Sequence, residues 1–267
     1  MTKLWSASLP GLLLGLIGLP LGPVPAASQE PESLVTDRPD FTESASVPGD
    51  GRIQVEGGWT VEGDGEARAH SLGELLVRIG IGERFEARIE PLTWIAVDGG
   101  EETVDPDDLD GLDDAGIGLK AMLFDGGPPS VPAAALLVGT TIPTGDDEIG
   151  EEGWQPEARL ALGWDLSELW SLGANAGWGR PEEDGERFDQ ALGSVALGRA
   201  IGERLGAFLE LYGLAPAGAG GDDDAAYLDG GLTLAFGPDS QLDARVGAGL
   251  TDAAADWFFG LGFARRF

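Results

Sequence analysis

The 267-residue sequence contains no cysteine and a single histidine, His70. Without cysteine, disulfide-stabilised scaffolds and thiolate chemistry are excluded. Basic residues are also scarce, because 16 Lys and Arg stand against 47 Asp and Glu, which gives a formal net charge of −31. Binding to nucleic acid needs clustered Lys and Arg on the phosphates, so nucleic acid is excluded as a partner.

Long hydrophobic runs are missing as well, apart from one near the start of the chain. That first stretch has one charge at Lys3, a leucine-rich run broken by Pro and Gly, and then Ala26 and Ala27. It predicts a cleavable signal peptide over residues 1–27 rather than a retained helix, which would need about 20 apolar residues. An exported chain without a spanning helix can cross a membrane only as a closed barrel.

Short segments of alternating apolar and polar residues fill the rest of the chain. In residues 52–62, Ile53, Val55 and Trp59 fall on one face and polar residues fall on the other, the period of a strand with one apolar side. Further segments of this kind, some weaker, are 74–81, 85–90, 117–123, 131–143, 157–164, 170–178, 188–200, 205–212, 226–236, 241–250 and 257–267. The prediction is an all-β fold over residues 51–267, an antiparallel up-and-down transmembrane β-barrel of about 12 strands.

The connections alternate between two kinds. Short turns are expected at 82–84, 125–130, 165–169, 202–204 and 237–240. Longer or more acidic loops are expected at 62–66, 98–114, 145–154, 180–187, 215–225 and 252–256. Bacterial barrels carry short turns on the periplasmic side, so both termini are expected in the periplasm and most of the acid outside the cell.

The last strand favours an outer-membrane barrel over a soluble β-sandwich. Residues 257–267 alternate apolar and small side chains and end on Phe267. They resemble the C-terminal recognition strand of bacterial outer-membrane barrels, although Arg265 stands where an apolar residue is usual. We therefore expect localisation in the cell outer membrane, with three partners: membrane lipid, lipopolysaccharide and, through Phe267, the barrel assembly machinery.

Charged residues of both signs are predicted on the inward faces of the strands. The lumen-lining candidates are Glu56, Arg78, Glu86, Arg88, Glu90, Lys120, Glu157, Arg159, Glu210, Asp229, Asp243 and Arg245. Two interpretations stay open: a salt-bridged filling that stabilises the barrel, and a polar pathway for a solute.

A mixed-charge segment precedes the first strand. Residues 28–50 are too few to form a domain, and they carry Asp37, Arg38, Asp40 and Glu43. The segment can fold into the barrel as a plug that pairs with lumen charges, or it can remain a periplasmic tether. Both alternatives stay open.

Metal and enzyme chemistry are weakly supported. The loop with Asp105, Asp107, Asp108 and Asp110 offers carboxylates for a hard cation, but it lacks EF-hand spacing, so a solvated surface loop is favoured. A hydrolase needs Ser and His on one face, whereas Ser71 directly follows the single histidine and projects to the other side of the strand. We expect no catalytic residues, no bound metal and no cofactor.

Residues 36–44 read Thr-Asp-Arg-Pro-Asp-Phe-Thr-Glu-Ser. In this stretch, and more generically at 71–80, 161–166, 209–213 and the terminal strand, the chain resembles the meta-pathway phenol-degradation family of outer-membrane transporters. The resemblance implies a barrel linked to aromatic catabolism. It leads us to expect passive uptake of small, hydrophobic or aromatic solutes; the alternatives are a structural or anchoring barrel without transport and a hydrolase embedded in the barrel.

Overall fold

The computed structural model describes residues 34–99, 109–183, 185–217 and 224–267. The predicted signal peptide lies outside these residues. The secondary structure of the described part is β-strand and turn, and none of it forms a helix with the length and apolarity to cross a membrane.

Sixteen strands are present in the described part. Their bounds are β1 Ile53–Asp64, β2 Ala67–Ile81, β3 Phe85–Glu90, β4 Trp94–Asp98, β5 Leu109–Leu112, β6 Ala115–Asp125, β7 Ala133–Ile142, β8 Gln155–Asp165, β9 Trp170–Gly179, β10 Glu182–Glu183, β11 Glu186–Arg187, β12 Asp189–Ile201, β13 Leu205–Ala217, β14 Ala225–Ala235, β15 Ser240–Gly249 and β16 Trp257–Arg266.

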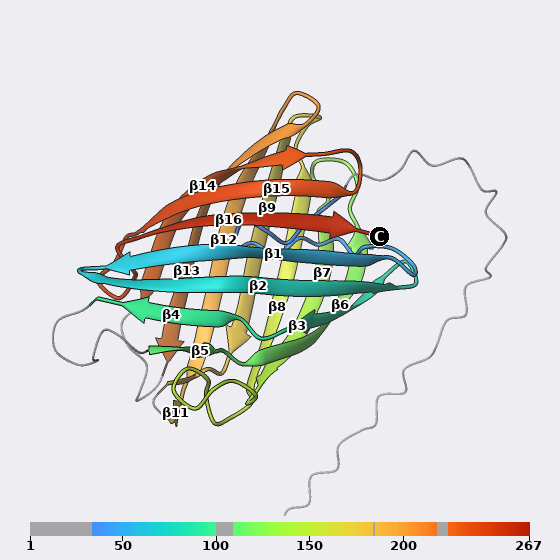
Figure 1. Ribbon diagram of the computed structural model, residues 1–267. Helices are drawn as coiled ribbons and strands as arrows, with labels where there is room; N and C mark the ends of the chain where they lie inside the picture. The colour runs from blue at the N-terminus through green and yellow to red at the C-terminus, as the bar shows by residue number, and fades with distance from the viewer. Residues whose placement is uncertain (1–33, 100–108, 184, 218–223) are drawn as a thin grey trace, which may run out of the picture. The chain divides into compact units, whose positions relative to one another are not determined.

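Twelve of these strands form a closed antiparallel barrel. Each pairs with its neighbours along the chain, and β1 pairs with both β2 and β16, which closes the ring (Figure 1). The predicted fold class and strand number are therefore confirmed. Phe267 completes the closing seam, because its N–H donates to the carbonyl of Ile53 at 2.8 Å. The side chain of Arg265 lies over the ring of Phe267, 5.6 Å from its centroid.

One region differs from the prediction. The strand expected at 85–90 continues after a break as β4, and the loop expected at 98–114 contains β5, which pairs with β4. The long strand β2 spans both pieces, pairing with β3 over one half and with β4 over the other. Pro91 lies in the break; it has no N–H to donate to the ladder, which accounts for the interruption.

The ends of the barrel differ in their connections. Three to seven residues join the strands at the end that holds the C-terminus, which we call the turn end; the opposite end we call the loop end. The connection at 62–66, expected among the longer or more acidic loops, is a tight turn, because β1 extends to Asp64 and β2 begins at Ala67. Gly65 in this turn has a φ of +53°, a conformation that glycine adopts without strain.

The barrel is polar inside and apolar outside. Of the seven largest side chains exposed by less than 2%, six are polar; in size order the seven are Arg78, Lys120, Phe258, Gln54, Glu56, Glu86 and Glu210. Large apolar side chains are exposed on the outer face, among them Ile81, Leu119, Leu209 and Val246. This reverses the arrangement of a soluble protein and matches a barrel wall that faces lipid.

Candidate functional site

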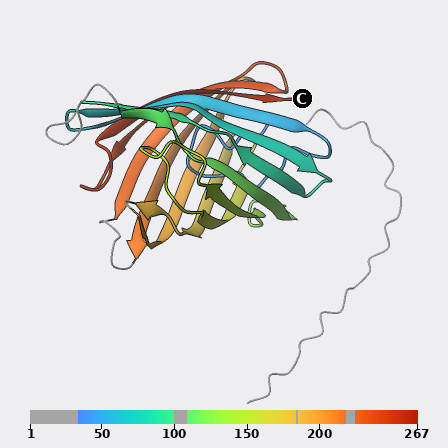
Figure 2. The same cartoon turned by 60° about the horizontal axis from the view of Figure 1, so that its bottom comes forward.

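Residues 34–50, which we call the N-terminal segment, run through the interior of the barrel. Figure 2 shows their blue trace inside the wall formed by the strands. The segment starts at the turn end, where the N–H of Leu34 donates to the carbonyl of Pro238 at 3.1 Å. Inside the barrel, the described segment contacts side chains from strands all around the ring. A plug and a tether are distinguished by whether removal of the segment changes the conductance.

The carboxylate of Asp37 is the centre of these contacts. Its Oδ2 accepts hydrogen bonds from Arg88 Nη1 at 2.6 Å and from Lys120 Nζ at 2.8 Å, and Arg78 Nη1 lies 3.3 Å away. Its Oδ1 accepts from both the backbone N–H and the hydroxyl of Ser44. The contacts with Arg78, Arg88 and Lys120 join the segment to strands β2, β3 and β6. The contacts with Ser44 close the segment into a loop.

Two wall carboxylates complete this charged cluster. Glu56 accepts hydrogen bonds from the backbone N–H groups of Asp37 and Arg38 and from Arg78 Nη1 at 3.1 Å. Glu86 accepts two hydrogen bonds from Arg78 and one from Arg88. Every cation of the cluster therefore has carboxylate partners, as buried charges require.

Glu43 joins the segment to β3 and β6 through its side chain and to β9 through its backbone. Its side chain pairs with Arg88 at 2.9 Å and with Lys120 at 3.5 Å, and its backbone exchanges two hydrogen bonds with the amide of Asn175 on β9. Burial, reinforced by the charge of Asp37, raises the pKa of Glu43 to about 7. For Asp37 itself, burial acts to raise the pKa, but the surrounding cations hold it well below its usual range.

A third group of contacts involves Glu210 on β13. Its carboxylate accepts hydrogen bonds from the backbone N–H groups of Phe41 and Thr42 at 2.7 and 2.8 Å, and from the Thr42 hydroxyl. Arg159 on β8 donates to the carbonyl of Phe41 at 3.2 Å. Burial and the nearby charge of Glu210 raise the pKa of Asp40 well above its usual value.

Arg38 occupies a narrow site beside β1, β2 and β16. Its guanidinium pairs with Glu74 at 3.0 Å and lies 3.7 Å from Asp243. A Cβ at Gly58 or at Gly262 would overlap this guanidinium, so the two glycines make the space that it fills. Glu74 has a φ of +40°, next to the point where the β1–β2 register shifts.

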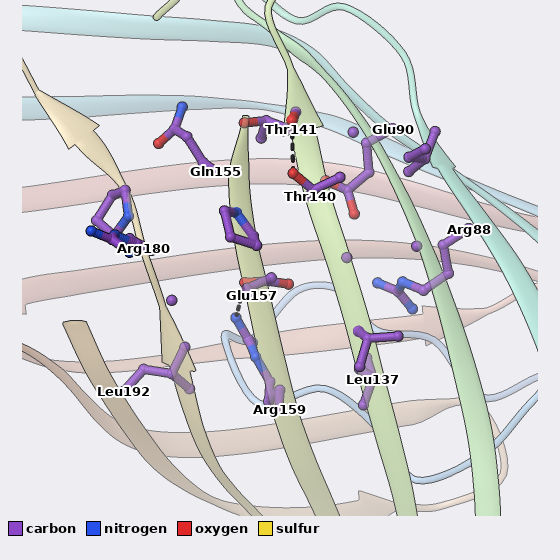
Figure 3. A pocket seen from close by; sticks show the side chains of 18 of the residues that line it. Arg88, Glu90, Leu137, Thr140, Thr141, Gln155, Glu157, Arg159, Arg180 and Leu192 are labelled. Carbon is purple, nitrogen blue, oxygen red and sulfur yellow. Dashed lines mark hydrogen bonds and ion pairs between the residues drawn. The ribbon is translucent and has the colours of Figure 1, made fainter. Parts of the chain in front are cut away.

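Two cavities flank the segment. The loop-end cavity has a volume of about 310 Å³, and the turn-end cavity has a volume of about 540 Å³. Glu43 lines both of them. Figure 3 shows the loop-end cavity, with Glu157 and Arg159 of β8 facing Arg88 and Glu90 of β3 across it.

The structure brings together most of the residues singled out from the sequence. Glu56, Arg78, Glu86, Arg88 and Lys120 meet Asp37 in the cluster, while Glu90, Glu157 and Arg159 line the loop-end cavity. The other four candidates lie on β13, β14 and β15: Glu210, Asp229, Asp243 and Arg245. Of the four residues suggested for a plug, Asp37, Arg38 and Glu43 make ion pairs with the wall.

Some contributing residues were missed. Gln54, Glu74 and Asn175 bond the segment although they were not selected as lumen-lining candidates. Glu74 is in phase with Arg78 on the predicted polar face, so alternation did place it on the inner side of the wall. Asn175 lies on the predicted polar face of its strand and could have been included.

The remaining candidate sites gain no support. Asp110 is exposed, Asp105, Asp107 and Asp108 lie outside the described residues, and among those described no three acidic or histidine residues group to hold a metal. His70 stacks on Trp59 and accepts a hydrogen bond from its indole N–H at 3.3 Å. Within the described part, no serine is hydrogen-bonded to this histidine.

Comparisons with known proteins agree with this architecture. The chain is similar to an outer membrane channel from Pseudomonas putida F1, with a TM-score of 0.62 and 16% identity over 87% of this chain and 100% of that one. It is also similar to the NanC porin, with a TM-score of 0.54 and 11% identity over 80% and 98% of the chains. No curated protein matches the sequence.

The protein-family comparison covers almost the whole described chain. A family described as "Putative MetA-pathway of phenol degradation" matches residues 36–267, from the N-terminal segment to the last residue of the barrel. The chain, a closed twelve-stranded barrel with the fold of outer-membrane channels, therefore belongs to the MetA-pathway phenol-degradation family.

Proposed function

We propose that the chain is an outer-membrane channel for passive uptake of small, hydrophobic or aromatic molecules, closed by residues 34–50 acting as a plug. The observation that carries the proposal is the position of Glu43, which lines both cavities and is held by cations of the wall. A solute passing between the two cavities has to move this part of the segment aside.

The charge pattern supports a removable plug. Barrel and segment meet through ion pairs and through hydrogen bonds to backbone N–H groups. Polar contacts exchange readily for contacts with water, so a polar interface separates more easily than an apolar core of equal size. The aromatic character of the solute is supported by family membership alone.

Removal of the segment tests the proposal. We would compare the mature protein with a variant lacking residues 28–47, each reconstituted into planar bilayers. The channel hypothesis predicts a larger and steadier conductance for the truncated protein. Equal conductance and equal gating would mean that the segment closes no pathway.

Solute entry is tested separately by liposome swelling. Phloroglucinol, a small polyhydroxylated aromatic, would be compared with xylose, with protein-free vesicles correcting for passage through lipid. We expect faster swelling with the truncated protein and a preference for the aromatic solute. If neither solute enters faster than into protein-free vesicles, the ion-paired interior serves stability and the structural alternative holds.

A hydrolase is the weaker candidate. The single histidine is bonded to an indole on the outer face, so a nucleophile and a base do not meet there.

The apolar outer face supports membrane lipid as a partner. Recognition of Phe267 by the assembly machinery and contact of the acidic loops with lipopolysaccharide belong to the proposal; exchanging Phe267 for Ser should slow assembly into the outer membrane.

A further inference from the structure

Four aromatic side chains form a row on the inside of the barrel. Phe41 of the N-terminal segment stacks on Tyr212 of β13, with ring centroids 4.6 Å apart and an interplanar angle of 11°. Tyr212 stacks on Tyr227 of β14 at 4.8 Å, and Tyr227 meets Phe258 of β16 edge to face at 6.1 Å. This aromatic row is contributed by three wall strands and the segment.

The ring of Phe41 has a second partner in Arg159. The guanidinium carbon of Arg159 lies 4.8 Å from the centroid of the Phe41 ring, the geometry of a cation–π contact. One aromatic ring of the segment is thus recognised by a flat tyrosine ring and by a cation, both belonging to the wall. An aromatic ring of a solute can make the same two contacts with Tyr212 and Arg159.

The backbone of Phe41 is held independently of its side chain. Its N–H donates to Glu210 at 2.7 Å and its carbonyl accepts from Arg159 at 3.2 Å. Rotation about the side-chain bonds can therefore vacate the ring position without breaking these hydrogen bonds. Such rotations cost far less than undocking the charged cluster.

The ring position is also close to free space. Arg159 lines the loop-end cavity as well as contacting Phe41. The volume of about 310 Å³ is at the small end of the range for ligand-binding cavities, which suits a single-ring molecule. A solute that enters this cavity meets the same guanidinium that holds the Phe41 ring.

We propose that the place of the Phe41 ring is a binding site for a neutral single-ring aromatic solute, which stacks on Tyr212 beside Arg159 after the phenylalanine side chain rotates away. Phe41 then acts as an internal competitor for the solute. The inference deepens the proposed uptake function and relies on it for the class of solute, whereas the site itself rests on the stacking geometry.

The composition of the chain supplies a direct probe. Tyr212 and Tyr227 are the two tyrosines of the whole sequence, and both belong to the aromatic row. Fluorotyrosine incorporated into the mature protein should give two ¹⁹F resonances, assigned with Tyr212→Phe and Tyr227→Phe. Phenol would be titrated into the refolded protein in detergent, with cyclohexanol as a probe of similar size that cannot stack.

We expect phenol to shift the Tyr212 resonance more than the Tyr227 resonance, and cyclohexanol to shift neither. Phe41→Leu should tighten phenol binding by about 2-fold to 10-fold, because it removes a stacking competitor of ordinary strength. Tyr212→Leu should abolish the phenol-dependent shift of Tyr227, whereas Tyr212→Phe should retain it. Phe236→Leu, at an exposed turn, is the matched control and should leave the titration unchanged.

Two results would overturn the inference: equal shifts with phenol and cyclohexanol, or unchanged phenol affinity in Phe41→Leu with the barrel folded. These outcomes are independent of the uptake assay. Swelling with the aromatic solute but no stacking shift would retain the channel and reject this site. A stacking shift without swelling would retain the site and reject the channel.

Discussion

Asp37→Asn should release the N-terminal segment without unfolding the barrel. The asparagine has the shape of the aspartate but no charge, and its amide group would face the cations that now pair with Asp37. Arg88 at 2.6 Å and Lys120 at 2.8 Å lose their shortest ionic partner, and Arg78 at 3.3 Å loses one of several.

The magnitude follows from the burial of these groups. Removing one partner of a buried ion pair costs about 3 to 5 kcal/mol, because the other charge stays behind unpaired. Each cation keeps another carboxylate: Arg78 keeps Glu56 and Glu86, Arg88 keeps Glu86 and Glu43, and Lys120 keeps Glu43 at 3.5 Å. The expected cost of Asp37→Asn is therefore at the lower end of that range, about 3 kcal/mol. That energy corresponds to a rise on the order of 100-fold in the ratio of undocked to docked segment.

The assay is single-channel recording in planar bilayers, with the closed fraction as the measured quantity. Asp50→Asn is the matched control, because it removes the same charge from the same segment at an exposed position where the side chain accepts one hydrogen bond, from Gly82. Heat-modified electrophoretic mobility would verify that the barrel is intact. A closed fraction that differs by less than about threefold between the two variants would refute the reasoning, since the ion network would then hold nothing in place.

Three further predictions concern pH, packing and selectivity. Burial and the charge of Asp37 raise the pKa of Glu43 to about 7, so protonation of Glu43 favours the docked segment. This contribution to docking is lost as the pH rises from about 4.5 through 7. Conductance should therefore increase between about pH 5.5 and about pH 8; Glu43→Gln should weaken this dependence, and the raised pKa of Asp40 accounts for the part that remains. Gly80→Ala would place a Cβ against the carbonyl of Gly49; overpacking of this kind costs about 1 to 3 kcal/mol, so the closed fraction in single-channel recordings should fall, and a fraction equal to the wild type would contradict this. In the truncated open barrel, reversal potentials should indicate cation selectivity, weakened when Asp105, Asp107, Asp108 and Asp110 all become Asn; a preference for chloride would rule out control by the acidic loops.

The closed barrel was predictable because its signals are local. Alternation in segments such as 52–62 depends only on neighbouring residues, since a strand places successive side chains on opposite faces. The terminal strand and the short turns follow from the same short-range information. The interruption at Pro91 was harder to predict from the sequence, because the continuation of the ladder into β4 and β5 depends on how far β2 extends beside it.

The sequence by itself determined an exported, acidic, twelve-stranded barrel with charges of both signs on its inner face. Only the tertiary structure decided which charges meet. Asp37 and Lys120 are 83 positions apart, and Thr42 and Glu210 are 168 apart, yet each pair is hydrogen-bonded. Such contacts depend on ring closure, strand register and the path of the N-terminal segment, none of which leaves a periodic trace in the sequence. The aromatic row has the same origin, because Phe41, Tyr212, Tyr227 and Phe258 become neighbours only when the wall curves around the segment.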